Sequence, residues 1–395
     1  MKSLCLSLAA ACAIASILPA AADPGVTDTS IKLGNTMPYS GPASGYSTVG
    51  RTAAAYFRMV NDKGGINGRT IEFLSADDAY APPKAVEQTR KLVEQDEVFA
   101  MVSSLGTPGN VAVQKYLNTK KIPQLLPLSG ASRWNDPKTF PWTTGAQPNY
   151  QTEGAIYARW ILQTRPDAKI ALIAPNDDVG RDYLKGFRSG LGPKAGQIVA
   201  EALYETTDPT IDSQVVAFRN AGADVFFNGG TPKFAAQALK KTVEIGWTPQ
   251  IILPTISNSV ATVLKPAGLE TAKGVVTGAY LKDPTDKAWD DDDGMKAFRA
   301  FMKTYYPGGD PDDSFNVTGY TFARIAAIAL QNAGRDLTRE GLMKAMHSLH
   351  DVTLPTLLPG IKVNTSADNV VPIRQLQMAR FDGASWVLFG DVLGE

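Results

Sequence analysis

Short apolar segments alternate with amphipathic segments along the first part of the chain. Strand patterns cover residues 31–36, 70–75, 98–103 and 123–128, and helix patterns lie between them at residues 49–61, 83–95 and 110–118. The segment 49–61 repeats its apolar side chains with the helical period. Short apolar strands that alternate with helices are typical of a parallel sheet covered by helices on both faces.

The same alternation starts again after residue 150. Helix patterns cover residues 150–164, 180–191, 211–220 and 234–245, and strand patterns cover residues 169–174, 198–204, 223–228 and 250–253. Two such series indicate two sheets rather than one. The sequence therefore predicts an α/β fold with two doubly wound parallel-sheet lobes.

The last third of the chain breaks this alternation. Helix patterns at residues 295–306, 320–332 and 339–349 follow one another, and strand patterns at 375–381 and 385–389 then surround the turn signal Asp382-Gly383. Such a block suggests that the chain crosses back between the lobes. We expect residues 23–145 plus 275–350 in lobe I and residues 146–274 plus 351–395 in lobe II.

The first 22 residues have the features of a secretory signal peptide. Lys2 precedes an uncharged apolar run from Leu4 to Leu18, and small residues follow it up to Ala22. A retained anchor and a lipoprotein attached through Cys12 are the alternatives, and the run is short for a membrane-spanning helix. We expect cleavage after Ala22 and export to a bacterial periplasm.

Charge and cysteine content narrow the classes of function. The 395-residue chain has 39 Lys plus Arg and 39 Asp plus Glu, and loss of Lys2 with the signal peptide leaves a net charge of −1. This balance provides no basic footprint for nucleic acid or an anionic membrane. Both cysteines, Cys5 and Cys12, lie in the signal peptide. The exported chain therefore has no disulfide, zinc–thiolate site or cysteine nucleophile.

Motifs of several enzyme classes are missing from the sequence. The chain has no Walker A phosphate loop, no G-x-G-x-x-G after its first strand and no G-x-S-x-G nucleophile elbow. His347 and His350 are interpreted as solvated side chains rather than metal ligands, because no carboxylate or thiol motif accompanies them. We assign no catalytic residue, metal or cofactor. An exported hydrolase or dehydrogenase that uses Asp, Glu, Lys or Tyr stays an alternative.

Several short motifs together resemble one family. They are Met37-Pro38-Tyr39-Ser40-Gly41-Pro42, the segment 61–68 (NDKGGING), Asp77-Asp78, the segments 116–127 and 226–231, Asp178-Val179-Gly180 and Gly246-Trp247. In this order they resemble the periplasmic binding proteins of ABC transporters, of the branched-chain amino acid (Leu/Ile/Val) type. The resemblance implies two lobes joined by a three-segment hinge, a ligand held between them, and delivery to an inner-membrane ABC permease.

The resemblance also implies a set of ligand-binding residues. Tyr46 resembles the aromatic residue that packs on the ligand in this family, and Leu105-Gly106-Thr107 and Ser129-Gly130 match segments that bind a carboxylate. Further positions implied by the resemblance are Tyr39, Ser40, Tyr150, Val179, Thr231, Thr255 and Tyr280. A Ser or Thr at the end of a strand is commonly a helix cap, so Thr107 and Ser129 have that simpler interpretation as well.

Two departures from the family pattern bear on the ligand. Thr255 and Gln147 stand where amino-acid binders place an acid that pairs with the ligand ammonium. Because an ammonium without a carboxylate partner is costly to desolvate, we expect a carboxylate ligand that lacks an α-ammonium. Aromatic acids of the benzoate or cinnamate type are favoured. If Glu153, Asp177 or Asp178 supplies the missing charge, an aliphatic amino acid becomes the ligand.

Two roles fit such a protein. Capture of a solute for uptake is the leading interpretation, and a periplasmic ligand-sensing module is the alternative from another class. Near-zero net charge and the lack of a long apolar stripe favour a monomer.

Overall fold

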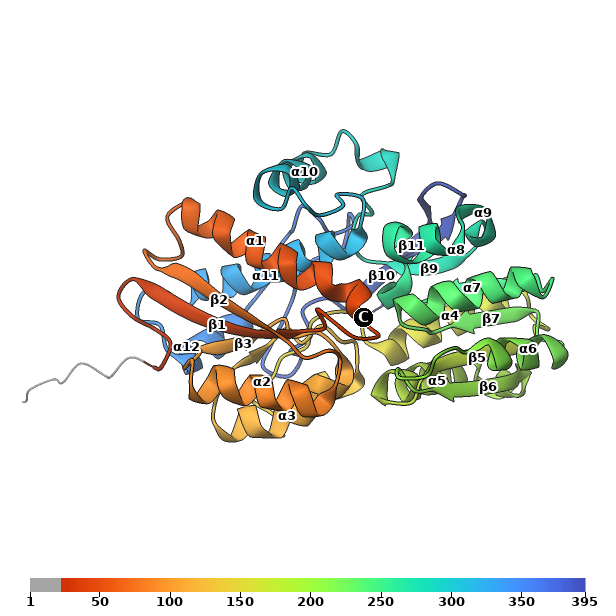
Figure 1. The fold of residues 1–395 in the computed structure, drawn as a ribbon, viewed down its shortest axis with the longest axis horizontal. Coiled ribbons are helices and arrows are strands. Elements are labelled where there is room, and N and C mark those ends of the chain that lie inside the picture. The colour runs from red at the N-terminus through yellow and green to blue at the C-terminus, as the bar shows by residue number, and fades with distance from the viewer. Residues whose placement is uncertain (1–22, 395) are drawn as a thin grey trace, which may run out of the picture.

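The computed structural model describes residues 23–394, and the expected signal peptide lies outside this range. Two lobes lie side by side along the long axis of the molecule (Figure 1). Within residues 23–394, no helix combines the length and the apolar character needed to cross a membrane. Each lobe is built around a sheet with helices on both of its faces, as the alternating pattern predicts.

The first lobe contains a four-stranded parallel sheet in the order β2-β1-β3-β4. Its strands are β1 (Ser30–Met37), β2 (Thr70–Asp77), β3 (Ala100–Val102) and β4 (Gln124–Leu125), and the intervening helices are α1 (Ser47–Asp62), α2 (Pro82–Glu94) and α3 (Thr107–Thr119). Strand β4 has two residues where the apolar run predicts six. The predicted strands and helices of this lobe are otherwise confirmed to within a few residues.

The second lobe contains a seven-stranded sheet in the order β11-β10-β9-β8-β7-β5-β6. Its elements in chain order are α4 (Tyr150–Thr164), β5 (Ile170–Pro175), α5 (Asp178–Leu191), β6 (Ile198–Tyr204), α6 (Asp212–Asn220), β7 (Val225–Asn228), α7 (Pro232–Glu244), β8 (Gln250–Leu253) and β9 (Val276–Ala279). These five strands are parallel. Strand β9 is absent from the predicted pattern, because it is four residues long and has glycine among its residues.

Side chains of alternating strand positions enter two different cores. Ile170 and Leu172 of β5 pack in the core that contains α4 and α5 side chains, whereas Ala171 and Ile173 pack in the core that contains α6 and α7 side chains. This period of two is the consequence of strand geometry. It explains why β5 reads as a continuous apolar run, since both of its faces are covered.

The C-terminal part of the chain serves both lobes. Helices α10 (Asp293–Tyr305), α11 (Ser314–Asn332) and α12 (Arg339–Met346) contribute side chains to the core of the first lobe. Strands β10 (Gln375–Phe381) and β11 (Trp386–Gly394) then form an antiparallel hairpin on the edge of the second sheet. The chain therefore passes between the lobes three times, and the expected return of the tail is confirmed. Helix α11 begins six residues before the predicted start because Asp313 caps it and accepts the N–H of Phe315.

The lobe divisions differ from those expected at residues 275 and 351. Strand β9 pairs with β8 and β10, so it belongs to the second lobe. Apolar side chains of residues 352–373 pack in the core of the first lobe. These two expected divisions are therefore too early in the chain. We propose divisions near residues 145, 280 and 374 instead.

Short helical segments complete the secondary structure. They are η1 (Ser44–Tyr46), η2 (Ser132–Trp134), η3 (Gly192–Gln197), η4 (Thr255–Ser257), the π-helical turn η5 (Val260–Leu264), α8 (Lys265–Ala267), α9 (Leu269–Ala272) and η6 (Lys287–Trp289). The segments η1 and η4 lie just beyond the carboxyl ends of β1 and β8 and lead into the site described next.

Candidate ligand-binding site

A cavity lies between the two lobes. Most of its walls come from loops that follow the carboxyl ends of parallel strands. After β3 comes Leu105–Thr107, after β5 comes Val179, after β7 comes Thr231, and after β8 comes Thr255. Open α/β sheets bind their ligands at this edge, because the loops there converge and the following helices begin there. Two such edges face each other across the cavity.

Most of the residues implied by the resemblance line this cavity. They are Tyr46, Leu105, Gly106, Thr107, Tyr150, Val179, Thr231, Thr255 and Tyr280. Gln147, the second position where an acid was expected and not found, also lines it. Four expected positions do not line it, and they have other structural roles.

Tyr39 and Ser40 are two of these four. The Tyr39 hydroxyl lies 2.6 Å from Ser75 Oγ, and its ring lies 5.1 Å below the Arg51 guanidinium. Ser40 is exposed, and its hydroxyl donates to the Asp77 carboxylate over 2.5 Å. Both side chains therefore stabilise the turn after β1 and contact other groups of the first lobe. The prediction that they contact the ligand is not supported by this geometry.

Gly130 is the third residue, and it fixes the start of α4. Its carbonyl accepts the N–H of Tyr150 over 2.7 Å. A Cβ atom at this position would lie 2.4 Å from the carbonyl oxygen of Pro148 and 2.7 Å from the Tyr150 ring. A glycine is therefore needed for Tyr150 to reach the cavity wall.

Ser129 is the fourth, and it orients a cavity residue instead of lining the cavity. Its Oγ accepts the Trp134 Nε1–H over 2.8 Å and the Ala131 N–H over 3.2 Å, and it lies 2.6 Å from Thr107 Oγ1. Since both lone pairs of Ser129 Oγ accept N–H groups, its own hydrogen points to Thr107. The Thr107 hydroxyl hydrogen is then free to donate into the cavity.

The N-terminus of α3 adds a second donor next to this hydroxyl. Gly106 precedes the helix with a φ of +103° and has no side chain to cap it. Within the described residues, the Thr107 N–H has no hydrogen-bond acceptor. An uncapped helix N-terminus of this kind attracts an anion through its free N–H groups and its dipole. The arrangement suits a carboxylate.

Aromatic rings form much of the remaining wall. Tyr46, Tyr80, Tyr150, Tyr280 and Phe315 line the cavity, and the Tyr46 and Phe315 ring centroids lie 5.1 Å apart. Burial raises the pKa of the Tyr46 hydroxyl well above its ordinary value, so the ring is neutral. No Asp, Glu, Lys, Arg or His is among the residues that line this cavity.

Glu153 lies behind the cavity wall and is fully buried. Its carboxylate accepts hydrogen bonds from the Tyr157 hydroxyl (2.6 Å), the Tyr183 hydroxyl (2.9 Å), and the N–H and hydroxyl of Thr255 (2.7 and 3.1 Å). Burial raises the pKa of Glu153. These four donors occupy the carboxylate, so Glu153 holds Thr255 in place and has no oxygen left for a ligand ammonium.

The two other acids considered as ammonium partners also have partners in the protein. Asp178 pairs with Arg133 over 3.0 Å and with Arg181 over 2.6 Å. Asp177 caps α5 and accepts the N–H of Val179 over 2.8 Å. Burial raises the pKa of Asp177 to about 6. Neither residue lines the cavity.

Direct contacts join the lobes around the cavity. The Tyr46 hydroxyl of the first lobe donates to the Ile256 carbonyl of the second lobe over 2.9 Å. The Asp313 carboxylate at the start of α11 accepts the hydroxyls of Ser259 (2.8 Å) and Thr262 (3.0 Å), which lie on the other lobe. These contacts indicate that the structure represents a closed arrangement of the lobes.

Sequence reasoning missed several lining residues. They are Val49, Tyr80, Leu128, Pro175, Ile256, Phe315 and Thr318. Tyr80 follows β2, so the tendency of open α/β sheets to bind ligands beyond the carboxyl ends of their strands could have found it. Phe315 and Thr318 lie in the first two turns of α11, and the predicted helix begins only after them, at residue 320.

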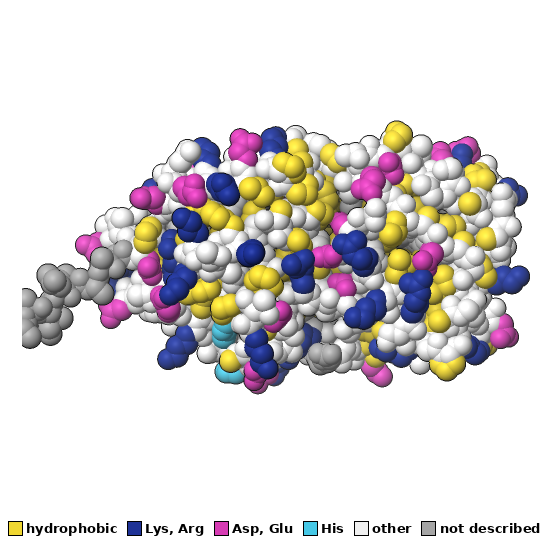
Figure 2. Space-filling model, turned by 90° about the horizontal axis from the view of Figure 1, so that it is seen from below, with side chains coloured by type: hydrophobic (Ala, Val, Ile, Leu, Met, Phe, Trp, Pro, Cys, Tyr) yellow, Lys and Arg dark blue, Asp and Glu magenta, His cyan; other side chains and the backbone are white. Residues whose placement is uncertain are grey.

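The described residues contain no cluster of side chains that could bind a metal ion. Across residues 23–394, no group of three or more His, Cys, Asp and Glu side chains could hold a metal ion. On the face shown in Figure 2, basic and acidic side chains are interspersed rather than gathered by sign. That face therefore has no basic surface of the kind that binds nucleic acid.

Comparison with known proteins identifies the family. The family model for periplasmic binding proteins matches residues 30–385. A Leu/Ile/Val-binding protein homologue of Brucella abortus is 24% identical over 326 residues, which cover 80% of this chain and 82% of that one. The valine-bound structure of a branched-chain amino acid ABC transporter protein from Thermus thermophilus has a TM-score of 0.84 at 16% identity, and covers 93% of this chain and 97% of that one.

A second solved structure is similar over the same length. The benzoate complex of an ABC transporter solute-binding protein from R. palustris has a TM-score of 0.78 at 19% identity, and covers 93% of this chain and 98% of that one. At these identities the two structures show the shared fold. The family match and the two-lobed fold together show that this chain belongs to the periplasmic binding protein family, as a type I member of the kind that serves ABC transporters.

Proposed function

We propose that this protein captures a small carboxylate, favoured to be an aromatic acid of the benzoate or cinnamate type, for uptake through an inner-membrane ABC permease. The single observation that carries the ligand class is the cavity lining, which has many aromatic rings and no charged side chain. We further propose that the chain is cleaved after Ala22, acts as a periplasmic monomer and catalyses no reaction.

The donors at the start of α3 provide the means to bind the carboxylate. The Thr107 N–H and hydroxyl are both free to donate, and neither needs a buried cation beside it. Hydrogen bonds to a charged group are stronger than those between neutral groups. The aromatic rings of Tyr46, Tyr150 and Phe315 would enclose the apolar body of the ligand.

Closure of the hinge would complete the site. Tyr46 lines the cavity and also donates to Ile256 across the lobes, so ligand contact and lobe contact share one side chain. A ligand that touches both lobes stabilises the closed state by its differential affinity for that state. The same closed state is the form that a permease would recognise.

An α-amino acid is the alternative ligand for the same transport role. Relatives named for Leu/Ile/Val binding favour it, whereas the lining offers no carboxylate to an ammonium. Glu153, Asp177 and Asp178 are all engaged with other groups of the protein. A periplasmic sensing module is the alternative from another class, and a gene for a sensor kinase beside this one would favour it.

A thermal-shift screen tests the ligand class. The purified protein is unfolded and refolded to remove any carried-over ligand, and it is then screened with benzoate, cinnamate, leucine, valine, amides and dicarboxylates. A ligand at a hundred times its Kd adds about 2.7 kcal/mol to the free energy of unfolding. A shift with aromatic acids alone supports the proposal. A shift with leucine or valine alone overturns the ligand class and keeps the transport role.

A further inference from the structure

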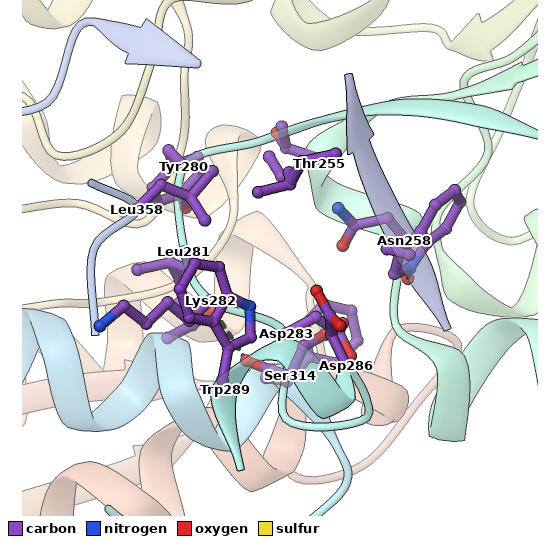
Figure 3. Close-up of a pocket in the computed structure, with 15 residues that line it drawn as sticks. Thr255, Asn258, Tyr280, Leu281, Lys282, Asp283, Asp286, Trp289, Ser314 and Leu358 are labelled. Atoms are coloured by element: carbon purple, nitrogen blue, oxygen red, sulfur yellow. Dashed lines mark hydrogen bonds between the residues drawn. The ribbon is translucent and has the colours of Figure 1, made fainter. Parts of the chain in front are cut away.

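A second cavity adjoins the first, and Figure 3 shows the residues that line it. The two cavities share four lining residues, namely Thr255, Tyr280, Phe315 and Thr318. Leu105, Gly106 and Thr107 line the first cavity but not the second, so the two cavities meet at the shared residues and not at this loop. A long ligand bound through its carboxylate at Thr107 would therefore extend toward the second cavity.

Two carboxylates line the second cavity. Asp283 and Asp286 lie on the segment between β9 and α10, and Figure 3 shows them close together at one end. Oδ1 of Asp283 accepts the N–H of Thr285 over 2.9 Å, and Oδ1 of Asp286 accepts the N–H of Ala288 over 2.9 Å. Within residues 23–394, the Oδ2 atom of each acid has no hydrogen-bond or ion-pair partner.

The one cation in this lining is already neutralised. Lys282 is buried, its Nζ lies 2.7 Å from Asp292 Oδ2, and the same Nζ lies 5.1 Å from the centre of the Trp289 ring. In Figure 3 its nitrogen points away from Asp283 and Asp286. Burial, together with the neighbouring Asp286 charge, raises the pKa of Asp283 to about 6. This direction is expected where no cation faces a carboxylate.

A buried hydroxyl in the same cavity also lacks a partner. Ser314 lines the cavity, and its Oγ is buried without a hydrogen-bond partner in the described part of the chain. Most buried polar atoms have a hydrogen-bond partner, so this hydroxyl is available to a group that enters the cavity. The cavity thus offers three acceptor groups, Asp283, Asp286 and Ser314, beside the apolar surfaces of Leu281 and Leu358.

We infer that the second cavity receives the far end of the ligand and selects an ammonium there, so that the preferred ligand is an aromatic acid with an amine at the end opposite its carboxylate. This inference rests on the proposed function, since it uses the carboxylate site at Thr107 as the other anchor. The ammonium is distal, so it does not need the acid that amino-acid binders place near the carboxylate. Its partners are Asp283 and Asp286.

Two isosteric ligand pairs test the inference by calorimetry. The first pair is 4-propylbenzoate and 4-(2-aminoethyl)benzoate, and the second is 4-ethylcinnamate and 4-(aminomethyl)cinnamate. Each pair differs only in a terminal methyl or ammonium group, and the two pairs place that group at different distances from the carboxylate. We expect the amine to bind at least tenfold more tightly than its neutral partner in one of the pairs.

Substitutions of Asp283 and Asp286 test whether this cavity causes the preference for the amine. Asp283→Asn and Asp286→Asn keep the acceptor atoms of their local turns. Together they should reduce the preference for the amine over its neutral partner to less than about threefold. Asp291→Asn is the matched control, because Asp291 is fully exposed and lies on the same segment. The neutral acid reports folding of the site in every variant.

The outcomes separate the two proposals. Equal or weaker binding of both amines, with the neutral acids bound, overturns the second-cavity inference and leaves the aromatic-acid proposal standing. A preference that survives the double variant also overturns it, because another group then binds the ammonium. Failure of all four compounds to bind overturns the second-cavity inference, and the thermal-shift screen with unsubstituted benzoate and cinnamate then decides whether the aromatic-acid proposal stands.

Discussion

The donor pair at Thr107 gives the sharpest test of the carboxylate site. Thr107→Val keeps the shape of the side chain and removes its hydroxyl. The free hydroxyl hydrogen follows from the Ser129 contacts, since the Trp134 and Ala131 N–H groups occupy Ser129 Oγ. The substitution therefore removes one donor to the ligand and also the acceptor of the Ser129 hydroxyl.

The charge of the ligand carboxylate determines how much affinity the loss of the Thr107 hydroxyl should cost. A hydrogen bond to a charged group contributes about 1.5–3 kcal/mol. Because about 1.4 kcal/mol is a tenfold change in Kd, Thr107→Val should weaken benzoate binding by about 10- to 150-fold. The buried Ser129 hydroxyl left without an acceptor should also lower the free energy of unfolding by about 1–3 kcal/mol. Thr107→Ser retains the donor and should weaken binding by less than about fivefold, since it loses one methyl group.

Calorimetric titration with benzoate, or with cinnamate where it binds more tightly, measures both variants against the original protein. Urea unfolding in the absence of ligand measures the stability term separately. A role for the Thr107 hydroxyl as a ligand donor is refuted if Thr107→Val binds the acid within threefold of the original protein. Equal losses for the valine and serine variants would also refute it, because the hydroxyl would then not be the donor.

Three further predictions concern closure and pH. Asp313→Ala removes the acceptor of two hydroxyls on the opposite lobe, so affinity should fall about tenfold and small-angle scattering should show a more open ligand-free molecule. Tyr46→Phe removes one bond between the lobes and should weaken binding by about two- to tenfold, whereas Tyr39→Phe, outside the cavity, should leave binding unchanged in the same titration. Asp78 is 1% exposed, and burial raises its pKa from 3.8 to about 6, so the folded state holds its proton more tightly than the unfolded state. The free energy of unfolding should therefore fall by up to about 3 kcal/mol as the pH rises from 4 to 7. Asp78→Asn should remove this pH dependence. If the difference in free energy of unfolding between the original protein and the variant does not vary with pH, the prediction is contradicted.

Elements with a strong period could be predicted from the sequence. The apolar run of β5 and the helical faces of α1 and α4 are long enough to exclude other interpretations, and the structure confirms them. Strand β9 has four residues and includes Gly278, so its place in the sheet depends on its pairing with β8 and β10 rather than on its own pattern. The lobe divisions expected at residues 275 and 351 differ from the structure for the same reason, because tertiary pairing decides which lobe a short segment joins.

The candidate site shows a similar limit. The resemblance to the family implied Leu105–Thr107, Val179 and Thr231 as ligand-binding positions, and all of them line the cavity. The resemblance implied a contact with the ligand carboxylate for both Ser129 and Thr107, although Ser129 contacts Thr107 and does not line the cavity. Sequence spacing places a residue near an edge of a sheet, but the hydrogen-bond partners of its side chain decide whether that group is free.

Glu153 shows why the presence of an acid near a cleft is not sufficient to bind an ammonium. In the sequence it is a carboxylate at the start of the second lobe, and it qualified as a partner for an amino-acid ligand. In the structure its four acceptor positions are taken by Tyr157, Tyr183 and Thr255. An ammonium could reach this carboxylate only by displacing one of these donors, and displacing the Thr255 N–H would leave a buried donor without an acceptor at a cost of about 1–3 kcal/mol. Because position 255 is a threonine and not an acid, no carboxylate faces the ligand there. Glu153 instead stabilises the part of the cavity wall that Thr255 forms.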